Sequence, residues 1–222
     1  MERTIRVTGK GKISVKPDLI QLNINAGEVY QDYSEAVKKS AEETEIVREA
    51  LNSAGLDPKE LKTVSFGIDT EYEGYQDDKG IWRQKFAGYR YHHSTYIRFP
   101  NDNEILGKVL YELSSCTAQV EFNIGYTVKD TEAAKNSLLA KAVADSRVKA
   151  EILCEAAGVK LGEIMNIDYS WGEMEIYTQP LNRMKAGGFG TMADMAEESL
   201  DISIEAEDIN VQDTVTVVWE IK

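Results

Sequence analysis

The chain has 222 residues and a formal net charge of −13. An acidic surface repels DNA, RNA and anionic lipid, so the charge argues against these partners and we expect no nucleic-acid binding. Hydrophobic residues make up 42% of the chain and charged residues 28%, as in soluble globular proteins, and no apolar run approaches the roughly 20 residues of a membrane helix, so we expect no membrane insertion.

The N-terminus enters a strand pattern at once, without a basic region followed by an apolar region, so no signal peptide is visible. Cys116 and Cys154 lie in apolar segments without a CxxC spacing, which favours buried free thiols. Reduced thiols suit a cytoplasmic protein. We therefore expect a cytoplasmic location, or a periplasmic or exported one if a leader has been removed.

Residues 4–26 alternate between apolar and polar side chains, which is typical of half-buried antiparallel strands. Gly9-Lys10-Gly11-Lys12 interrupts the pattern and raises the question of a phosphate site. A P-loop needs Gly-Lys followed by Ser or Thr and then a helix, but here Ile13 follows and the strand pattern resumes. We interpret the two glycines as a bulge or tight turn between strands.

Residues 32–54 switch to a helical period, with Asp32 or Ser34 as the N-cap and Gly55 as the residue that ends the helix. Asp57-Pro58 then predicts a short helical turn. The buried face of the predicted helix is an apolar stripe of Val37, Ser40, Thr44, Val47, Leu51 and Ala54.

Strand and helix periods alternate in the next part of the chain. They predict a strand over 62–72, a polar turn over 73–80, strands over 81–87 and 88–99, a helix from Asn101 or Asp102 to about Ser114, and a strand over 118–127.

A long helix is predicted from Thr131 to about Ala157, ended by Gly158, and strands are predicted over 163–171 and 211–221. Its buried stripe is predicted to be Leu139, Ala142, Val143, Ser146, Ala150, Leu153 and Ala157. This order of elements predicts an α+β fold, in which antiparallel β-sheets are covered on one face by helices. We expect a single domain over 1–222 with an irregular insertion at about 172–206.

The set of segments resembles the SIMPL-domain family, which includes bacterial oxidative-stress defence and periplasmic immunogenic proteins. The likeness rests on Ile5–Gly27, Leu51–Tyr72, Gly88-Tyr89, Ala142–Ile164 and the valine-rich Val211–Ile221. The resemblance implies an α+β fold, ring-like oligomers in some members and a link to stress resistance. The family has no agreed catalytic activity, so the resemblance supplies no catalytic residues.

Motifs for chemistry are scarce in the sequence. His92 and His93 are the only histidines, and as neighbours in a strand they point to opposite faces, so they cannot chelate one metal together. No G-x-S-x-G or H-E-x-x-H motif occurs, and the acidic turn at 71–80 lacks the EF-hand spacing. We predict a non-enzymatic protein without cofactor or metal residues. The alternative is a small-molecule binder or hydrolase-type enzyme that uses the region of His92, His93 and the tyrosines.

The strongest functional signal is an uneven distribution of charge. Residues 81–99 contain four cations, six aromatic residues and no acid, whereas residues 187–213 contain eight acids and no Lys or Arg. The basic aromatic segment could be an ordinary sheet with solvated arginines, a stacking platform for single-stranded nucleic acid, which the net charge opposes, or a protein contact rich in Tyr, Trp and Arg.

We favour a homo-oligomer in which the acidic, Met-rich segment of one subunit packs on the basic aromatic hairpin of its neighbour. Such a head-to-tail contact can close a ring. The residues predicted to make this contact are Trp82, Arg83, Lys85, Phe86, Tyr89, Arg90, Tyr91, Arg98, Met192, Met195, Glu197, Glu198 and Asp201.

Overall fold

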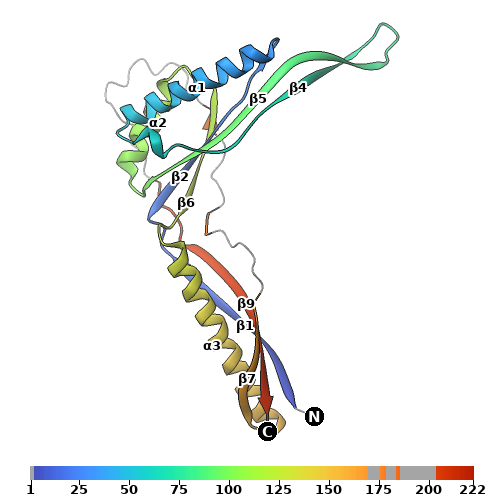
Figure 1. The fold of residues 1–222 in the computed structure, drawn as a ribbon. Coiled ribbons are helices and arrows are strands. Elements are labelled where there is room, and N and C mark those ends of the chain that lie inside the picture. The colour runs from blue at the N-terminus through green and yellow to red at the C-terminus, as the bar shows by residue number, and fades with distance from the viewer. Residues whose placement is uncertain (1–2, 170–175, 179–183, 186–203) are drawn as a thin grey trace. The chain divides into compact units, whose positions relative to one another are not determined.

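The structure, a computed structural model, describes residues 3–169, 176–178, 184–185 and 204–222 (Figure 1). Its antiparallel sheets and helices confirm the predicted α+β fold. The elements gather into two compact units, and the first is built from three separate stretches of the chain, Met1–Pro17, Thr127–Thr178 and Ala206–Lys222. The second contains Asp18–Tyr126 and Gln179–Glu205. Whether the two units behave as the single expected domain stays a prediction, and most of the expected insertion lies outside the described residues.

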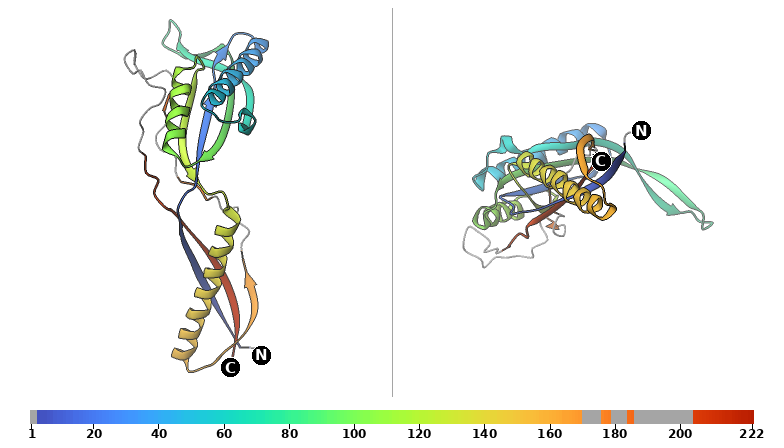
Figure 2. Two further views of the ribbon diagram at one scale, coloured as in Figure 1. Left: turned by 90° about the vertical axis from the view of Figure 1, so that its left-hand side faces the viewer. Right: turned by 90° about the horizontal axis from the view of Figure 1, so that it is seen from below.

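Unit 1 is a three-stranded antiparallel sheet with one long helix on one face (Figures 1 and 2). The strand order is β1-β9-β7, and the helix is α3. The bounds are Thr4–Val15 for β1, Leu161–Asp168 for β7, Ile209–Ile221 for β9 and Thr131–Ala157 for α3. The core between helix and sheet contains Val7, Ala142, Ala150, Val215, Val217 and Trp219.

The prediction of a bulge or turn at the two N-terminal glycines is wrong. β1 runs through them and pairs with β9 without a register shift, from Thr4 opposite Glu220 to Val15 opposite Ile209. A Cβ at Gly9 would lie 2.0 Å from the Ala142 carbonyl oxygen of α3. A Cβ at Gly11 would lie 2.1 Å from the carbonyl oxygen of Leu138. The glycines are therefore the positions at which the helix backbone touches the strand.

Side chains of α3 also cover the outer edge of β1. The amide of Lys10 donates to Asp145 Oδ2 at 2.7 Å, and Lys149 Nζ donates to the Thr8 carbonyl at 3.3 Å. The hydrogen bond from Lys149, followed by that from the Lys10 amide, lowers the pKa of the Asp145 carboxyl. An open strand edge is a template for unwanted pairing, so these bonds protect β1.

The limits of α3 are those predicted from the sequence. The Asp130 side chain accepts a hydrogen bond from the Ala133 amide at 2.8 Å, and Gly158 follows the helix in the left-handed region with φ 68°. The predicted buried stripe is correct in its centre but wrong at Leu153 and Ala157, which are exposed, whereas Cys154 is buried. Both cysteines are free, as expected.

Unit 2 contains a larger antiparallel sheet with the order β3-β5-β2-β6-β8, and β4 pairs with β5. Helices α1 and α2 lie together over one face of it (Figures 1 and 2). The strands are Leu19–Ala26 (β2), Val29–Tyr30 (β3), Lys62–Gln76 (β4), Trp82–Pro100 (β5), Val120–Thr127 (β6) and Met184–Lys185 (β8). The helices are Tyr33–Ser53 (α1) and Asn103–Ser115 (α2), with a short 3₁₀ turn at Pro58–Glu60.

Several cap predictions for unit 2 are confirmed, but the polar turn predicted over 73–80 is shorter, because β4 continues to Gln76. Asp102 caps α2 by accepting from the Glu104 amide at 2.8 Å, and Gly55 after α1 has φ 87°. The two strands predicted over 81–87 and 88–99 are instead one strand, β5, with a bulge beside Gly88. Gly88 has φ 146°, and a Cβ there would lie 2.4 Å from the carbonyl oxygen of Tyr30. The glycine marks a bulge rather than a strand end.

Within the described ranges, no helix combines the length and the apolar character needed to cross a membrane.

Replacing Gly9 or Gly11 by alanine tests the close contact between β1 and α3. The added methyl group has no space beside the helix backbone, so we expect a loss of about 1–3 kcal/mol in the free energy of unfolding, the usual range for overpacking. Urea unfolding monitored by circular dichroism measures this loss. The matched control is Lys10→Ala, because that side chain is exposed; equal losses in all three variants would contradict the packing argument.

Candidate functional site

β4 and β5 continue as a two-stranded ribbon past the end of α1 (Figures 1 and 2). We call residues 69–90, which include the connecting turn, the arm. Strand residues that are directly opposite share a face, so the pairing of Tyr72 with Phe86 and of Gln76 with Trp82 places these three aromatic residues on one side of the ribbon. The arm therefore has two faces of different chemistry.

The first face, the apolar arm face, consists of Tyr72, Trp82, Phe86 and Tyr89. Its rings form a chain of edge-to-face contacts, with centroids 6.0 Å apart for Tyr72–Phe86 and 5.3 Å apart for Phe86–Tyr89. Tyr89 in turn meets Tyr33 of α1 at 5.7 Å. The exposed fractions are 54% for Tyr72, 71% for Trp82 and 40% for Phe86. Contacts with α1 thus cover only the base of this aromatic row.

The second face, the charged arm face, pairs cations of β5 with acids of β4. Arg90 makes two 3.2 Å hydrogen bonds to the Glu71 carboxylate, and Lys85 lies opposite Glu73 in the ladder. Near the turn, Arg83 Nε is 2.7 Å from Asp77 Oδ2, and this bond lowers the pKa of the Asp77 carboxyl. Two of the four cations counted in residues 81–99, Arg83 and Arg90, are therefore paired with acids of the same hairpin, and Lys85 lies opposite a third acid.

The predicted contact residues separate into three groups. Trp82, Arg83, Lys85, Phe86, Tyr89 and Arg90 all lie on the arm. Tyr91 and Arg98 do not: Tyr91 is fully buried, which contradicts its prediction as a contact residue, and Arg98 donates to Gln21 of β2 at 2.8 Å and lies over the Tyr96 ring. Met192, Met195, Glu197, Glu198 and Asp201 lie outside the described residues.

Tyr91 connects the base of the arm to α1. Its hydroxyl donates to the buried carboxylate of Glu43, and its ring stacks on Tyr30 with centroids 6.3 Å apart. Burial, followed by the hydrogen bond to Glu43, raises the pKa of the Tyr91 hydroxyl above its ordinary value. The bond gives Glu43 a partner away from water, which an acid in this position needs.

Glu43 is absent from the buried stripe that was predicted for this helix. The buried residues of α1 are Ala36, Ser40, Glu43, Val47, Ala50 and Leu51. A buried stripe with three- and four-residue spacing that begins at Ala36, rather than at the exposed Val37, includes Glu43.

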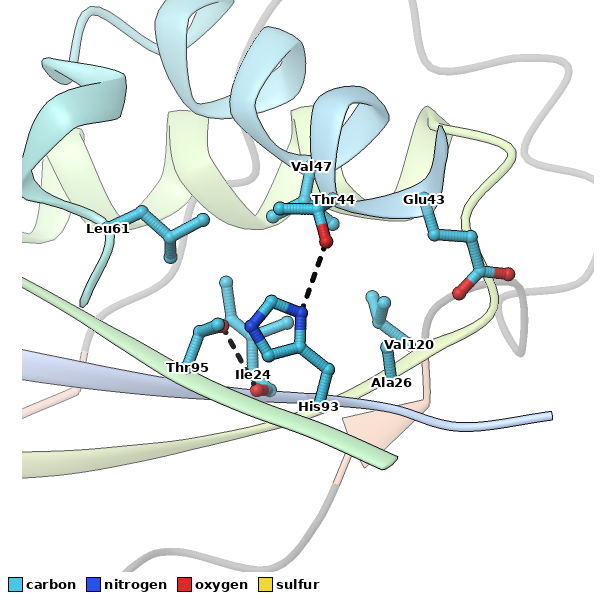
Figure 3. Close-up of a pocket in the computed structure, with 9 residues that line it drawn as sticks. All are labelled: Ile24, Ala26, Glu43, Thr44, Val47, Leu61, His93, Thr95 and Val120. Carbon is cyan, nitrogen blue, oxygen red and sulfur yellow. Dashed lines mark hydrogen bonds between the residues drawn. The ribbon is translucent and has the colours of Figure 1, made fainter. Parts of the chain in front are cut away.

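His93 lines a small hollow between α1 and the sheet (Figure 3). Its Nδ1 is 3.1 Å from Thr44 Oγ1, its Nε2 is 3.0 Å from Thr63 Oγ1, and the edge of its ring meets Phe66. The hollow has about 240 Å³ of empty space, part of it open to solvent, and is lined by Ile24, Ala26, Glu43, Thr44, Val47, Leu61, His93, Thr95 and Val120.

This hollow suits structural packing better than chemistry. Both ring nitrogens of His93 already have hydroxyl partners, and drug-sized ligands occupy pockets of about 300–1,000 Å³. His92 projects from the opposite face, with Nδ1 3.3 Å from Asp69 Oδ2, so the two histidines do not share a site. Across the described ranges, no cluster of three or more His, Cys, Asp or Glu side chains could hold a metal ion.

Comparison with known proteins gives two findings. Residues 5–219 match the model of a family described as "SIMPL: Protein of unknown function (DUF541)". The chain is also 29% identical over 220 residues to 26 kDa periplasmic immunogenic proteins of Brucella melitensis biotype 1 and Brucella abortus strain S19, with 98% of this chain and 84% of each relative covered. These relatives are named as periplasmic, which overturns the expectation of a cytoplasmic location.

His93 predicts a dependence of stability on pH. Burial, followed by the charge of Arg48, lowers the pKa of its imidazole below the ordinary 6.5. The unfolded chain then takes up a proton at a higher pH than the folded chain. The contribution of His93 to the free energy of unfolding is therefore complete above about pH 6.5. It is lost as the pH falls through the pKa of His93 in the folded chain.

We expect His93→Gln to remove this part of the acid-side loss, because glutamine is neutral and can still bond to hydroxyl groups. Urea unfolding between about pH 8 and 5, where histidine titrates, measures the effect. The control is His92→Gln, on the exposed opposite face. If wild type and His93→Gln lose stability equally, the assignment to His93 is wrong.

Proposed function

Because the chain belongs to the SIMPL family, we propose that it works without catalysis, as an oligomeric scaffold or protein-interaction module whose contact surface is the apolar arm face. The observation that carries this proposal is the row of exposed aromatic rings on a ribbon that leaves the body of its unit. Exposed apolar patches with Trp and Tyr are typical of protein interfaces. A two-stranded ribbon is marginally stable alone, so burial of this face by a partner also stabilises the arm.

The partner in this proposal is a second copy of the chain. Family resemblance supports self-assembly, and a head-to-tail contact between an arm and another surface of a neighbour can close a ring. The ion pairs on the charged arm face change the physical basis of the contact. Apolar burial drives the association, while Arg83, Lys85 and Arg90 are already matched by acids of the same hairpin.

The location proposed for this module is the periplasm or another exported compartment, on the basis of the names of the Brucella proteins. A role in stress resistance is part of the proposal and rests on family resemblance. The alternative of a small-molecule binder or hydrolase has less support. Both ring nitrogens of His93 already have hydroxyl partners in Thr44 and Thr63, and His92 lies on the opposite face of the strand.

Substitution of Tyr72, Trp82 and Phe86 together by serine tests the arm as the contact surface. Loss of the three rings removes apolar area that the contact would bury, so we expect the native mass measured by light scattering to fall. The matched control is Glu73→Gln with Lys85→Gln, which changes the charged arm face and keeps the net charge. An unchanged mass in the serine variant, with the wild-type circular dichroism spectrum, would refute the proposal.

Salt distinguishes apolar from electrostatic association. Near 1 M salt the Debye length is about 3 Å, so exposed charge pairs between subunits are screened. We expect the native mass to be the same at low salt and near 1 M, because both arginines of the arm, Arg83 and Arg90, are paired within the hairpin. Dissociation in high salt would instead favour a contact between the arm and the acidic segment at 187–213.

A further inference from the structure

Helix α3 is apolar on two opposite faces. Residues two positions apart in an α-helix point in nearly opposite directions, so a stripe two positions from the buried one faces solvent. The face against the sheet buries Ala134, Leu138, Ala142, Ser146, Ala150 and Cys154. The outer stripe, defined here as Ala140, Ala144, Val148, Ile152 and Ala156, has no polar member and is exposed at every position.

The outer stripe exposes branched side chains that water does not favour. Val148 is 54% exposed and Ile152 is 60% exposed. A surface helix normally carries polar residues opposite its buried face, and a helix that is apolar all round is normally buried. The sequence of α3 is thus that of a helix with a partner on both sides.

Charges beside the outer stripe match a second copy of the same helix. Arg147 and Glu151 form a 3.1 Å pair on one flank, and Asp145 and Lys149 form a 2.7 Å pair on the other. Asp145 and Lys149 also bond to β1. A two-fold axis that passes near Val148 and runs across both helices makes the two helices antiparallel. Each flank of one helix then faces the same flank of the second copy, with its residues in reverse order. Arg147 of one chain then lies within reach of Glu151 of the other, which provides charge complementarity.

We propose that the outer stripe of α3 binds the same stripe of a second copy of this chain, with Val148 of each copy meeting at the two-fold axis. The stripe follows the four-residue ridge of the helix. Two such ridges interdigitate at a crossing angle of about −50°, with the axes about 8–10 Å apart. Contact is then concentrated on Ala144, Val148 and Ile152, and Ala140 lies where the helices diverge.

This interface goes beyond the proposed function, because it uses a different surface. The arm belongs to unit 2, whereas α3 belongs to unit 1. The contact of α3 is isologous and closes a pair, while the arm contact is head-to-tail. Each can therefore be present without the other, and each has its own test.

Disulfide cross-linking of the full-length chain tests the α3 contact. In the variant Val148→Cys, the new thiols of two copies lie at the axis, so mild oxidation should produce a dimer band on a non-reducing gel. The matched control is Ala140→Cys, also exposed on the outer stripe but away from the crossing point; it should remain monomeric on the gel. Wild type, which retains Cys116 and Cys154, gives the background.

We expect a dimer band in Val148→Cys and no band above background in Ala140→Cys. Equal bands in both variants would indicate helices aligned side by side and would overturn the crossing geometry. No band above background in Val148→Cys, with the wild-type circular dichroism spectrum, would overturn the interface. Combining Val148→Cys with the serine substitutions at Tyr72, Trp82 and Phe86 separates the two proposals, because the α3 band should persist whether or not the arm contact exists.

Discussion

Strand β5 is the element on which unit 2 depends. It pairs with β2, β3 and β4, and its buried half contributes Tyr91, Ile97 and Phe99 to the core. The same strand then continues past the bulge at Gly88 into the arm. Because one uninterrupted strand serves both parts, the orientation of the exposed rings is set by pairing and packing at the base of the arm. The hydrogen bond from Tyr91 to Glu43 connects that base to α1, and so the proposed interaction surface is supported by the core.

Unit 1 is organised by a different constraint, the closeness of a helix backbone to a strand backbone. Gly9 and Gly11 leave no Cβ on β1, and the facing positions of α3 include the small residues Ala142 and Ser146. With its inner face packed so closely, α3 can also bond to the edge of β1 through Asp145 and Lys149. Its inner face is thereby fixed, and this determines which side chains point to solvent. The folded unit therefore shows which apolar residues of α3 face solvent. The sequence alone does not show this as a simple amphipathic pattern.

Much of the fold could be predicted from local patterns, because alternation, caps and glycine stops act between neighbours in the sequence. The α+β class and the limits of α3 were both accessible in this way. What could not be predicted depends on distant partners. The role of Gly9 depends on a helix more than a hundred residues later, and the burial of Glu43 depends on Tyr91. Arg83 and Arg90 of β5 are paired with Asp77 and Glu71, which lie on the other side of the hairpin. Counting charge along one strand overlooks the strand beside it.

The pairing of β1 with β9 has a consequence for how the molecule is made. Thr4 is opposite Glu220, so β1 is synthesised long before the strand with which it pairs. Unit 2 is built mainly from one continuous stretch, Asp18–Tyr126, and its contacts can form while the chain is still growing. The edge of β1 that pairs with β9 stays uncovered until β9 has been synthesised. Unit 1 is therefore the part with the highest contact order, and its slow, long-range closure leaves the nascent chain most open to wrong pairing or to chaperone binding.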